Sequence, residues 1–424
     1  MPLSEDDGRI SRIVDFFDRR FLLIVIFASI IIPLVHYEVP ELGEFFFWAG
    51  ENGSVATSIV QGRGFANPYP EVETGPSAWV APLFPYLLAA VFWIAGTKTA
   101  AAAHLAVFLQ CLIYAGTIWF LYRIVEKTFS AACARIAILI WLINPTRVML
   151  TSHFLSEVGL STLTLLLAVL ALVHFRDTPT RRVAAAAGLA IGLAVLCLPV
   201  VALAVPFYLY SLYAMANTRR TPAWIVPALA CVVCVAVLAP WLVRNYVVFG
   251  RFIFIKSNFG HVLYMGNNDR VDERDLYPYT ASWERDLMGQ AGESAYARQS
   301  FWTGVAWIKD HKKEYATRFI SRAFGFWVTN LDMGVKWWLW SVYQIMLLAG
   351  AAVGAWRHWR RSPVTTLCCA VLISVPIAYY MTAVYDAPRL RLPFDALLAI
   401  LASSAVSATQ AKHQAGVATV APIG

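Results

Sequence analysis

The stretch 81–95, APLFPYLLAAVFWIA, decides how this chain is threaded through a membrane. It is apolar, but it is shorter than the roughly 20 residues that a membrane-spanning helix needs. Pro82 and Pro85 stand close to its beginning. We therefore predict a helix that lies in the membrane interface and does not cross, with aromatic side chains at headgroup depth. These aromatic residues are Trp79, Phe84, Tyr86 and Trp93.

The composition indicates an integral membrane protein. Of the 424 residues, 59% are hydrophobic and only 14% are charged. A soluble domain could not bury so much apolar surface. We predict an all-α polytopic membrane protein with about ten transmembrane helices. The expected spans are about 20–37, 100–122, 132–151, 154–175, 182–198, 200–216, 222–242, 337–356, 364–384 and 392–409.

Basic residues set the expected orientation. If 81–95 does not cross and the N-terminus is cytoplasmic, every later basic cluster falls on the cytoplasmic side, as the positive-inside rule requires. If 81–95 crossed, these clusters would leave the side that holds Arg19 and Arg20. This bias also accounts for the net charge of +8 without nucleic-acid binding, because no basic stripe with interleaved aromatic residues is present. The clusters are Arg123 and Lys127, Arg176 with Arg181 and Arg182, Arg219 and Arg220, and Arg357, Arg360 and Arg361.

This threading divides the chain into one membrane domain and two short ends. We expect a cytoplasmic N-terminal segment, 1–19, a polytopic domain, 20–409, and a disordered tail, 410–424. The outer side receives two loops, 38–99, with interfacial helices, and 243–336. The second loop has about ninety residues, a length that is usually functional. Its section 295–327 is predicted to form an amphipathic helical run.

Cysteine and histidine residues give no pattern of a disulfide framework or a metal site. Nearly all of the seven cysteines lie in apolar runs. Cys231 and Cys234 have CxxC spacing, but within an apolar helix we interpret them as structural. No HExxH, P-loop, GxSxG or GxGxxG motif occurs in a suitable context. No cofactor is predicted, although a divalent cation remains open.

Polar side chains gather in the segments expected on the outer side. Several guanidinium groups at one membrane surface suit a phosphate at headgroup depth, which arginine can bind with two parallel hydrogen bonds. The alternative is that these arginines snorkel and bind ordinary lipid headgroups. The residues are Glu51 and Arg63 in WAGENGSVATSIVQGRGFANPYP (48–70), then Arg244, Asn245 and Lys256, and finally Arg389 and Arg391.

Glu157 is the one carboxylate near the outer end of a predicted span. An ionisable group in that place is a functional candidate. The alternative is a carboxylate that stabilises the positive end of a helix dipole.

Several motifs, in this order, resemble the C-type membrane glycosyltransferases. They are GRGF (62–65), GPSAWVAPLFPYLLAAVFWIAG (75–96), PWLVRNYVVFGRF (240–252), MGNND (265–269) and RLRLP (389–393). Within that superfamily the chain resembles the bacterial branch that is similar to protein O-mannosyltransferases and aminoarabinose transferases. The resemblance covers nearly the whole chain.

The resemblance implies a multi-pass enzyme of the bacterial inner membrane. Such enzymes move a sugar, with inversion, from a polyprenyl-phosphate carrier to a lipid, glycan or protein acceptor at the outer face. An acidic residue in the first outer loop serves as base. Relatives often carry an Asp-Glu pair there, which is absent here, and Trp48 stands where an Asp is often found. Glu51 is the nearest carboxylate, and Glu44 is the alternative.

The remaining candidate residues then take roles around the donor. Arginine can stabilise the departing phosphate without a metal. Asparagine side chains can hydrogen-bond sugar hydroxyls, and Glu157 could orient an arginine or the sugar. The phosphate ligands are expected to be Arg244, Arg389 and Arg391, with Arg63 and Lys256 in addition, and the sugar ligands Asn245, Asn258 and Asn267.

Two other functions remain open on the sequence. A lipid-linked glycan polymerase or ligase would use a similar donor that carries a preassembled chain. A transporter or flippase would place charges or broken helices near the bilayer midplane. The predicted spans are almost free of charge at their centres, which favours a transferase.

Overall fold

The computed structural model describes residues 5–35, 37, 47–69, 73–152, 155–216, 222–269, 288–290, 292–328, 335–382 and 387–407. Within these ranges the regular elements are helices, with one isolated bridge between Ala66 and Pro76, so the predicted all-α class is confirmed. The helices of the first half are α1 Glu5–Val35, α2 Glu51–Val60, α3 Leu83–Ala95, α4 Ala100–Thr128, α5 Ala131–Leu142, α6 Pro145–Ser152, α7 Glu157–Asp177, α8 Arg181–Cys197, the 3-10 helix η1 Pro199–Ala204 and α9 Val205–Ala216.

The second half continues with both apolar and amphipathic helices. They are α10 Ile225–Phe249, α11 Phe259–Gly266, α13 Glu293–Asp310, α14 Lys312–Trp327, α15 Val335–His358, α16 Pro363–Ser374, α17 Ile377–Tyr380 and α18 Ala387–Ser404. The predicted amphipathic run 295–327 is thus two helices that meet at His311. The predicted tail, 410–424, lies outside the described residues.

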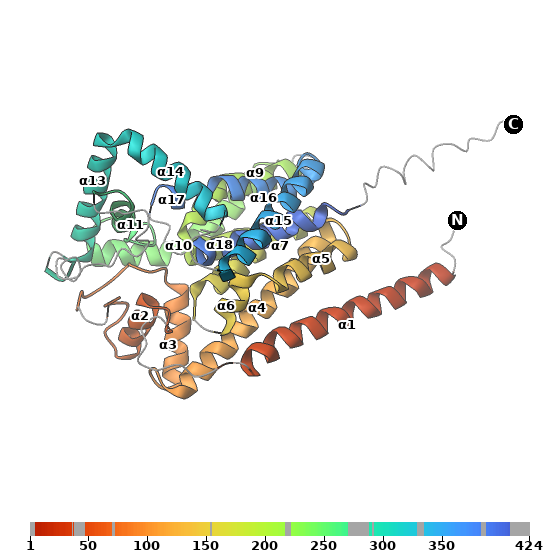
Figure 1. Ribbon diagram of the computed structural model, residues 1–424, viewed down its shortest axis with the longest axis horizontal. Helices are drawn as coiled ribbons and strands as arrows, with labels where there is room; N and C mark the ends of the chain where they lie inside the picture. The colour runs from red at the N-terminus through yellow and green to blue at the C-terminus, as the bar shows by residue number, and fades with distance from the viewer. Residues whose placement is uncertain are drawn as a thin grey trace.

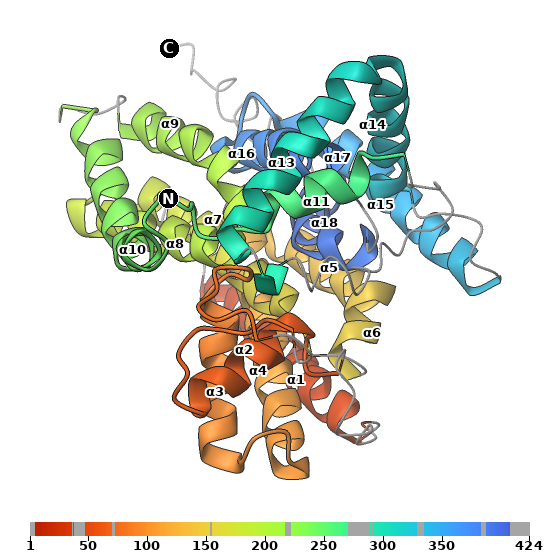
Figure 2. The same cartoon turned by 90° about the vertical axis from the view of Figure 1, so that its left-hand side faces the viewer.

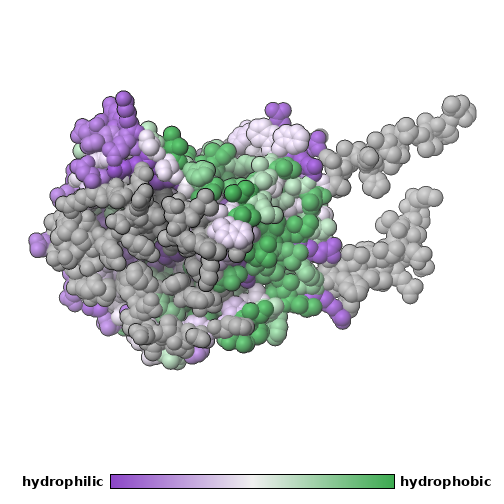
Figure 3. Space-filling view, viewed as in Figure 1, coloured by the Kyte–Doolittle hydropathy of each residue, from purple (hydrophilic) through white to green (hydrophobic). Residues whose placement is uncertain are grey.

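Apolar surface identifies a multi-pass membrane protein. Five helical segments of the described chain are long and apolar enough to cross a membrane, and three apolar helices are shorter. Figure 3 shows hydrophobic side chains in a belt toward the right of the view, with hydrophilic side chains at its right edge and at the upper left. The count of about ten spans stays a prediction. The five segments are Ala100–Thr128, Glu157–Asp177, Pro199–Ala216, Ile225–Phe249 and Pro363–Tyr380.

Two of the other predicted spans differ from continuous apolar helices for local reasons. The expected span 132–151 is interrupted at Asn144, since α5 ends at Leu142 and Pro145 begins α6. Proline has no backbone N–H and fits the first turn of a helix, so it separates the two helices. In α18, the charged residues Arg389, Arg391 and Asp395 interrupt the apolar run.

The two ends of the molecule differ in what they carry. The beginning of α1 and the end of α18 lie at the same end, on the right in Figure 1. Helices α2, α3, α11 and α13 gather at the opposite end, which we call the loop end (Figure 1). There the axis of α3 is clearly inclined to the axis of α4 (Figure 1). The interfacial position of α3 stays a prediction.

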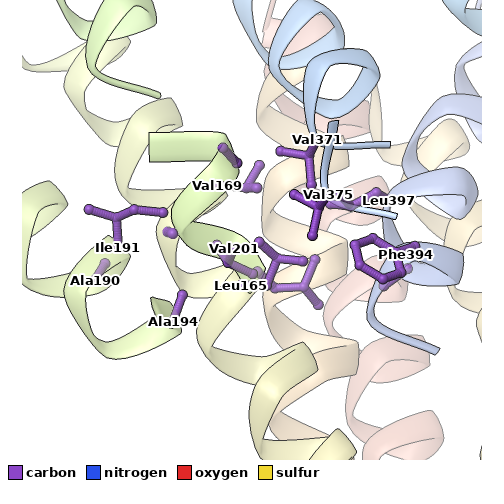
Figure 4. Packing of buried hydrophobic residues seen from close by; sticks show 14 of the residues in the cluster. Leu165, Val169, Ala190, Ile191, Ala194, Val201, Val371, Val375, Phe394 and Leu397 are labelled. Atoms are coloured by element: carbon purple, nitrogen blue, oxygen red, sulfur yellow. The ribbon is translucent and has the colours of Figure 1, made fainter. Parts of the chain in front are cut away.

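The core between the helices is built from small and branched apolar side chains. Figure 4 shows Leu165 and Val169 of α7 packing between α8, η1 and the C-terminal helices. Helix α8 approaches α10 closely because Gly188 faces Ala230, and a Cβ at position 188 would lie 2.3 Å from the Ala230 carbonyl oxygen. Such small residues let helix backbones pack tightly within a membrane.

Serine and threonine residues fix where several helices begin. Each hydroxyl accepts a hydrogen bond from a backbone N–H in the first turn, which would otherwise have no partner there. For example, the Ser156 hydroxyl accepts from the Val158 N–H at 3.3 Å and fixes the start of α7. The same arrangement is found at Thr99, Ser130, Thr180 and Ser362.

Candidate functional site

Four predicted site residues come together at the loop end. Glu51 is the first residue of α2 and Glu157 the first residue of α7. Lys256 lies between α10 and α11, and Arg389 lies in the first turn of α18. The charges of Lys256, Arg389 and Glu157 all act on Glu51. We call these four residues the charge cluster; Figure 2 views the molecule from the loop end that carries it.

The surroundings of Glu51 shift the pKa of its carboxyl group. Burial raises its pKa, the positive charges of Arg389 and Lys256 oppose this rise, and the Glu157 carboxylate adds to it. The net effect is a raised pKa. A carboxylate whose pKa is closer to neutral is a better general base.

Lys256 has the complementary environment. Burial lowers the pKa of its ammonium group, the carboxylates of Glu157 and Glu51 oppose this, and Arg389 adds to the lowering. Two carboxylates therefore face two cations. An arginine and a lysine in partly buried surroundings can bind a phosphate strongly, because little water competes with them.

The backbone before Glu51 takes an unusual path. Ala49 and Gly50 both have positive φ, 62° and 57°. This conformation is unfavourable for alanine, which has a Cβ. Trp48 anchors the turn, since its side chain is fully buried and its ring lies 4.9 Å from Phe47 and 5.1 Å from Phe92, centroid to centroid. The buried ring thus fixes the point from which Glu51 extends.

Gly53 is required by the same turn, and this gives a first prediction. A Cβ at position 53 would lie 2.4 Å from the Trp48 carbonyl oxygen, which is backbone and cannot move aside. Helix propensity alone would make Gly53→Ala stabilising by about 1 kcal/mol. We expect the opposite, a loss of about 1–3 kcal/mol from overpacking, seen as a lower melting temperature in detergent. The control is Thr57→Ala in the same helix, which adds no atoms; an unchanged melting temperature for Gly53→Ala would contradict the packing.

The start of α7, where Glu157 lies, is held by α4 and by the segment 47–52. The Ser156 N–H donates to Gln110 Oε1 of α4 at 2.9 Å, and the Leu155 N–H donates to the Phe47 carbonyl at 3.1 Å. Asn52 Nδ2 reaches Glu157 Oε2 at 3.5 Å. The start of α7 is therefore tied to the segment that carries Glu51.

Two predicted phosphate ligands make other contacts. Arg63 is exposed and pairs with Glu73 at 3.3 Å. Arg244 donates to the carbonyls of Ser77, at 2.6 Å, and Phe65, at 2.9 Å, and its guanidinium lies over the Trp241 ring. Arg244 therefore ties the first loop to α10.

The remaining predicted ligands are mostly buried and bound to backbone. Asn267 is fully buried and donates to the carbonyls of Leu263 and Met381. Arg391 is buried and donates to the Phe326 carbonyl at 2.7 Å. Asn245 is fully buried against the carbonyls of residues 253 and 255. Asn258 precedes α11 and is partly buried, and Glu44 lies outside the described residues.

A buried polar network around Asp395 of α18 was not predicted from the sequence. Asp395 is 1% exposed, and its carboxylate lies 3.3 Å from Arg391 Nε. It also accepts from Asn144 Nδ2 at 3.0 Å and from Gln344 Nε2 at 3.2 Å. The Arg-x-x-x-Asp spacing in an apolar helix could have indicated it, because such charges are costly in lipid unless paired.

Glu293, at the start of α13, was also missed. It is 2% exposed, and its Oε1 accepts from the Ala78 N–H at 2.7 Å and from the Ser257 hydroxyl at 2.5 Å. Burial raises the pKa of Glu293, and these hydrogen bonds together with one from Ser77 and the charge of Arg244 oppose the rise. Nothing in the local sequence distinguishes this glutamate from others on an amphipathic helix.

The charged groups at the site offer little to a divalent cation. Among the described residues, no three His, Cys, Asp or Glu side chains gather at one place. The two carboxylates of the charge cluster already face Lys256 and Arg389. This donor set therefore suits an anionic ligand better than a metal ion.

Comparison with known proteins identifies related sequences and folds. A family model described as dolichyl-phosphate-mannose-protein mannosyltransferase matches residues 79–243. This range includes Glu157 but not Glu51, Lys256 or Arg389. No curated protein sequence matches the chain.

Solved structures resemble this chain at low sequence identity, and the two with a TM-score above 0.5 share its fold. The oligosaccharyltransferase AglB of Archaeoglobus fulgidus, in complex with an inhibitory peptide and a dolichol-phosphate, has a TM-score of 0.58 at 14% identity over 97% of this chain. An Archaeoglobus fulgidus oligosaccharyltransferase tethered with an acceptor peptide has a TM-score of 0.57 at 15% identity, covering 95% of this chain and 50% of that one. ArnT of Cupriavidus metallidurans, bound to undecaprenyl phosphate, has a TM-score of 0.41 at 16% identity, covering 92% of this chain and 77% of that one.

The match with AglB is one of fold alone, because the sequence identity is 14%. This chain spans 52% of the AglB chain. The family-model match and the shared fold agree with the resemblance seen in the motifs. The chain has the fold of the C-type membrane glycosyltransferase superfamily.

Proposed function

We propose that this protein transfers a sugar from a polyprenyl-phosphate donor to an acceptor at the outer face of a bacterial inner membrane. The charge cluster carries the proposal. Glu51, Glu157, Lys256 and Arg389 are far apart in the chain, yet their charges act on one another at the loop end. A base beside two cations is the set of groups that such a transfer needs.

In the proposed mechanism the Glu51 carboxylate takes the proton of an acceptor hydroxyl. The acceptor oxygen then forms a bond to the anomeric carbon as the bond from that carbon to the phosphate oxygen breaks. The electron pair leaves with the polyprenyl phosphate. Arg389 and Lys256 stabilise this developing charge, and Glu157 holds the two cations in place.

The other candidate residues receive supporting roles in this proposal. Arg244 holds the carbonyls of Phe65 and Ser77, so it shapes the first loop around the site. Arg391 bonds to the end of α14 and to Asp395, which fixes the α18 turn that bears Arg389. Asn258 is the candidate that remains for a sugar hydroxyl. Arg63 is the candidate for a lipid headgroup at the surface.

The test is an assay of the purified protein with a panel of polyprenyl-phosphate sugars. We expect release of free polyprenyl phosphate with at least one single-sugar donor, and the same release with a chelator present. Release only from donors that carry preassembled glycans would instead indicate a polymerase or ligase. Movement of an intact donor across a vesicle membrane without release would indicate a flippase and contradict the proposal.

A further inference from the structure

The chain makes a strained turn immediately before Lys256. The Lys256 N–H donates to the Phe254 carbonyl at 2.6 Å, which closes a γ-turn around Ile255. Ile255 has φ 57° and is completely buried. A positive φ is rare for a β-branched residue, and a γ-turn of this sign is the strained form. The turn can persist only if surrounding groups hold it.

Two side chains of α10 hold this turn from one side. Trp241 Nε1 donates to the Ile255 carbonyl at 2.9 Å. Asn245 Nδ2 donates to the carbonyls of Ile253, at 3.2 Å, and Ile255, at 3.3 Å. Trp241 and Asn245 are one helical turn apart and project to the same face of α10.

The residue after Lys256 is fixed from the other side. The Ser257 N–H donates to the Ala78 carbonyl at 2.8 Å, and the Ser257 hydroxyl donates to Glu293. Lys256 is thus the single residue between two bound positions, Ile255 and Ser257. The backbone on both sides of Lys256 is therefore fixed, and this fixed backbone sets the direction in which the lysine side chain leaves the chain.

We propose that Asn245, together with Trp241, is a positioning residue for Lys256: it holds the strained turn at Ile255 that presents the lysine ammonium to the charge cluster. The inference rests on the proposed function only for the role of Lys256 in donor binding. It explains why Asn245, expected in the sequence to bind a sugar, is fully buried against backbone carbonyls.

A double-mutant cycle tests whether Asn245 acts through Lys256. The variants are Asn245→Ala, Lys256→Met and the two combined, and the measurement is kcat/KM for the lipid-linked donor. We expect each single change to lower kcat/KM by about ten- to a hundred-fold, mainly through KM, and the combined variant to be no worse than Lys256→Met within about twofold. Multiplicative losses would mean that Asn245 acts independently of Lys256 and would overturn the inference.

A second measurement needs no turnover, so it separates this inference from the proposed function. Reductive ¹³C-dimethylation of the intact protein allows the pKa of Lys256 to be followed by NMR, with the signal assigned by Lys256→Arg. The charged groups that face it are Glu51, Glu157 and Arg389. We expect a pKa below that of an ordinary lysine in the wild type and a return toward the ordinary value in Asn245→Ala.

Asn268→Ala is the matched control, because Asn268 also donates to two backbone carbonyls, those of Tyr264 and Met265, away from the turn. The pKa of Lys256 should not change in this variant. If Asn245→Ala does not fold, Trp241→Phe carries the same expectation, since it keeps an aromatic ring and removes one donor to the Ile255 carbonyl. An unchanged pKa of Lys256 in a folded Asn245→Ala or Trp241→Phe protein would overturn the inference, whether or not any donor is turned over.

Discussion

Glu51→Gln is expected to lower the turnover of a lipid-linked sugar donor by about 10²- to 10⁴-fold, the usual contribution of a general base. The amide keeps the shape of the side chain but cannot accept the acceptor's proton. Because burial opposes the charge of this carboxylate, its removal should leave the melting temperature unchanged or higher. The measurement is single-turnover release of polyprenyl phosphate, together with thermal unfolding.

The matched control is Glu73→Gln, since Glu73 is in the same loop but is exposed and pairs only at the surface with Arg63. Its turnover should equal that of the wild type. The pH profile adds a second check. Glu51 is active when deprotonated and its pKa is raised, so wild-type turnover should begin to fall, as pH decreases, at a higher pH than an ordinary glutamate would give. Wild-type turnover in Glu51→Gln would remove Glu51 from the mechanism.

Arg389→Gln has the second largest expected effect, a loss of about 10²- to 10³-fold in kcat, as for other groups that stabilise charge in a transition state. The positive charge of Arg389 acts on Glu51, and in the proposed mechanism it also stabilises the departing phosphate. Arg389→Lys should recover part of the rate, because lysine keeps the charge but not the paired donors. Steady-state kcat and KM for the donor, measured for Arg389→Gln and Arg389→Lys, check both the loss and the partial recovery.

Removal of Arg389 should also move the pH profile. The Arg389 charge lowers the pKa of Glu51, so in Arg389→Gln the loss of residual turnover on acidification should begin at a higher pH than in the wild type. Arg298→Gln, on the exposed surface of α13, is the control and should change neither rate nor profile. A lower rate with an unshifted profile would place Arg389 away from Glu51.

The four residues of the charge cluster are among those that the sequence predicts at one polar surface, because lipid excludes charge. Glu51, Lys256 and Arg389 are ionisable groups next to apolar helices, and such groups must meet at a polar surface. The sequence could not separate Arg389 from Arg244, since both are arginines at the end of an apolar run. Only the path of the first loop shows that Arg244 is bound by the Phe65 and Ser77 carbonyls.

The limits of the fold prediction have similar causes. Apolar length predicted α4, α7 and α10 well, because a long apolar run has few alternatives in a membrane. The predicted span 132–151 is broken at Asn144, whose side chain donates to Asp395, about 250 residues later in the chain. The roles of Ile255 and Glu293 depend on contacts between distant segments, and no local pattern carries them.

The most direct measurement is an experimental structure of the protein with a polyprenyl phosphate bound. We expect the phosphate to lie within hydrogen-bond distance of Arg389 and Lys256, with the Glu51 carboxylate on the side from which an acceptor would approach. A phosphate bound instead at Arg63, or at the opposite end of the molecule from α2 and α11, would contradict the account.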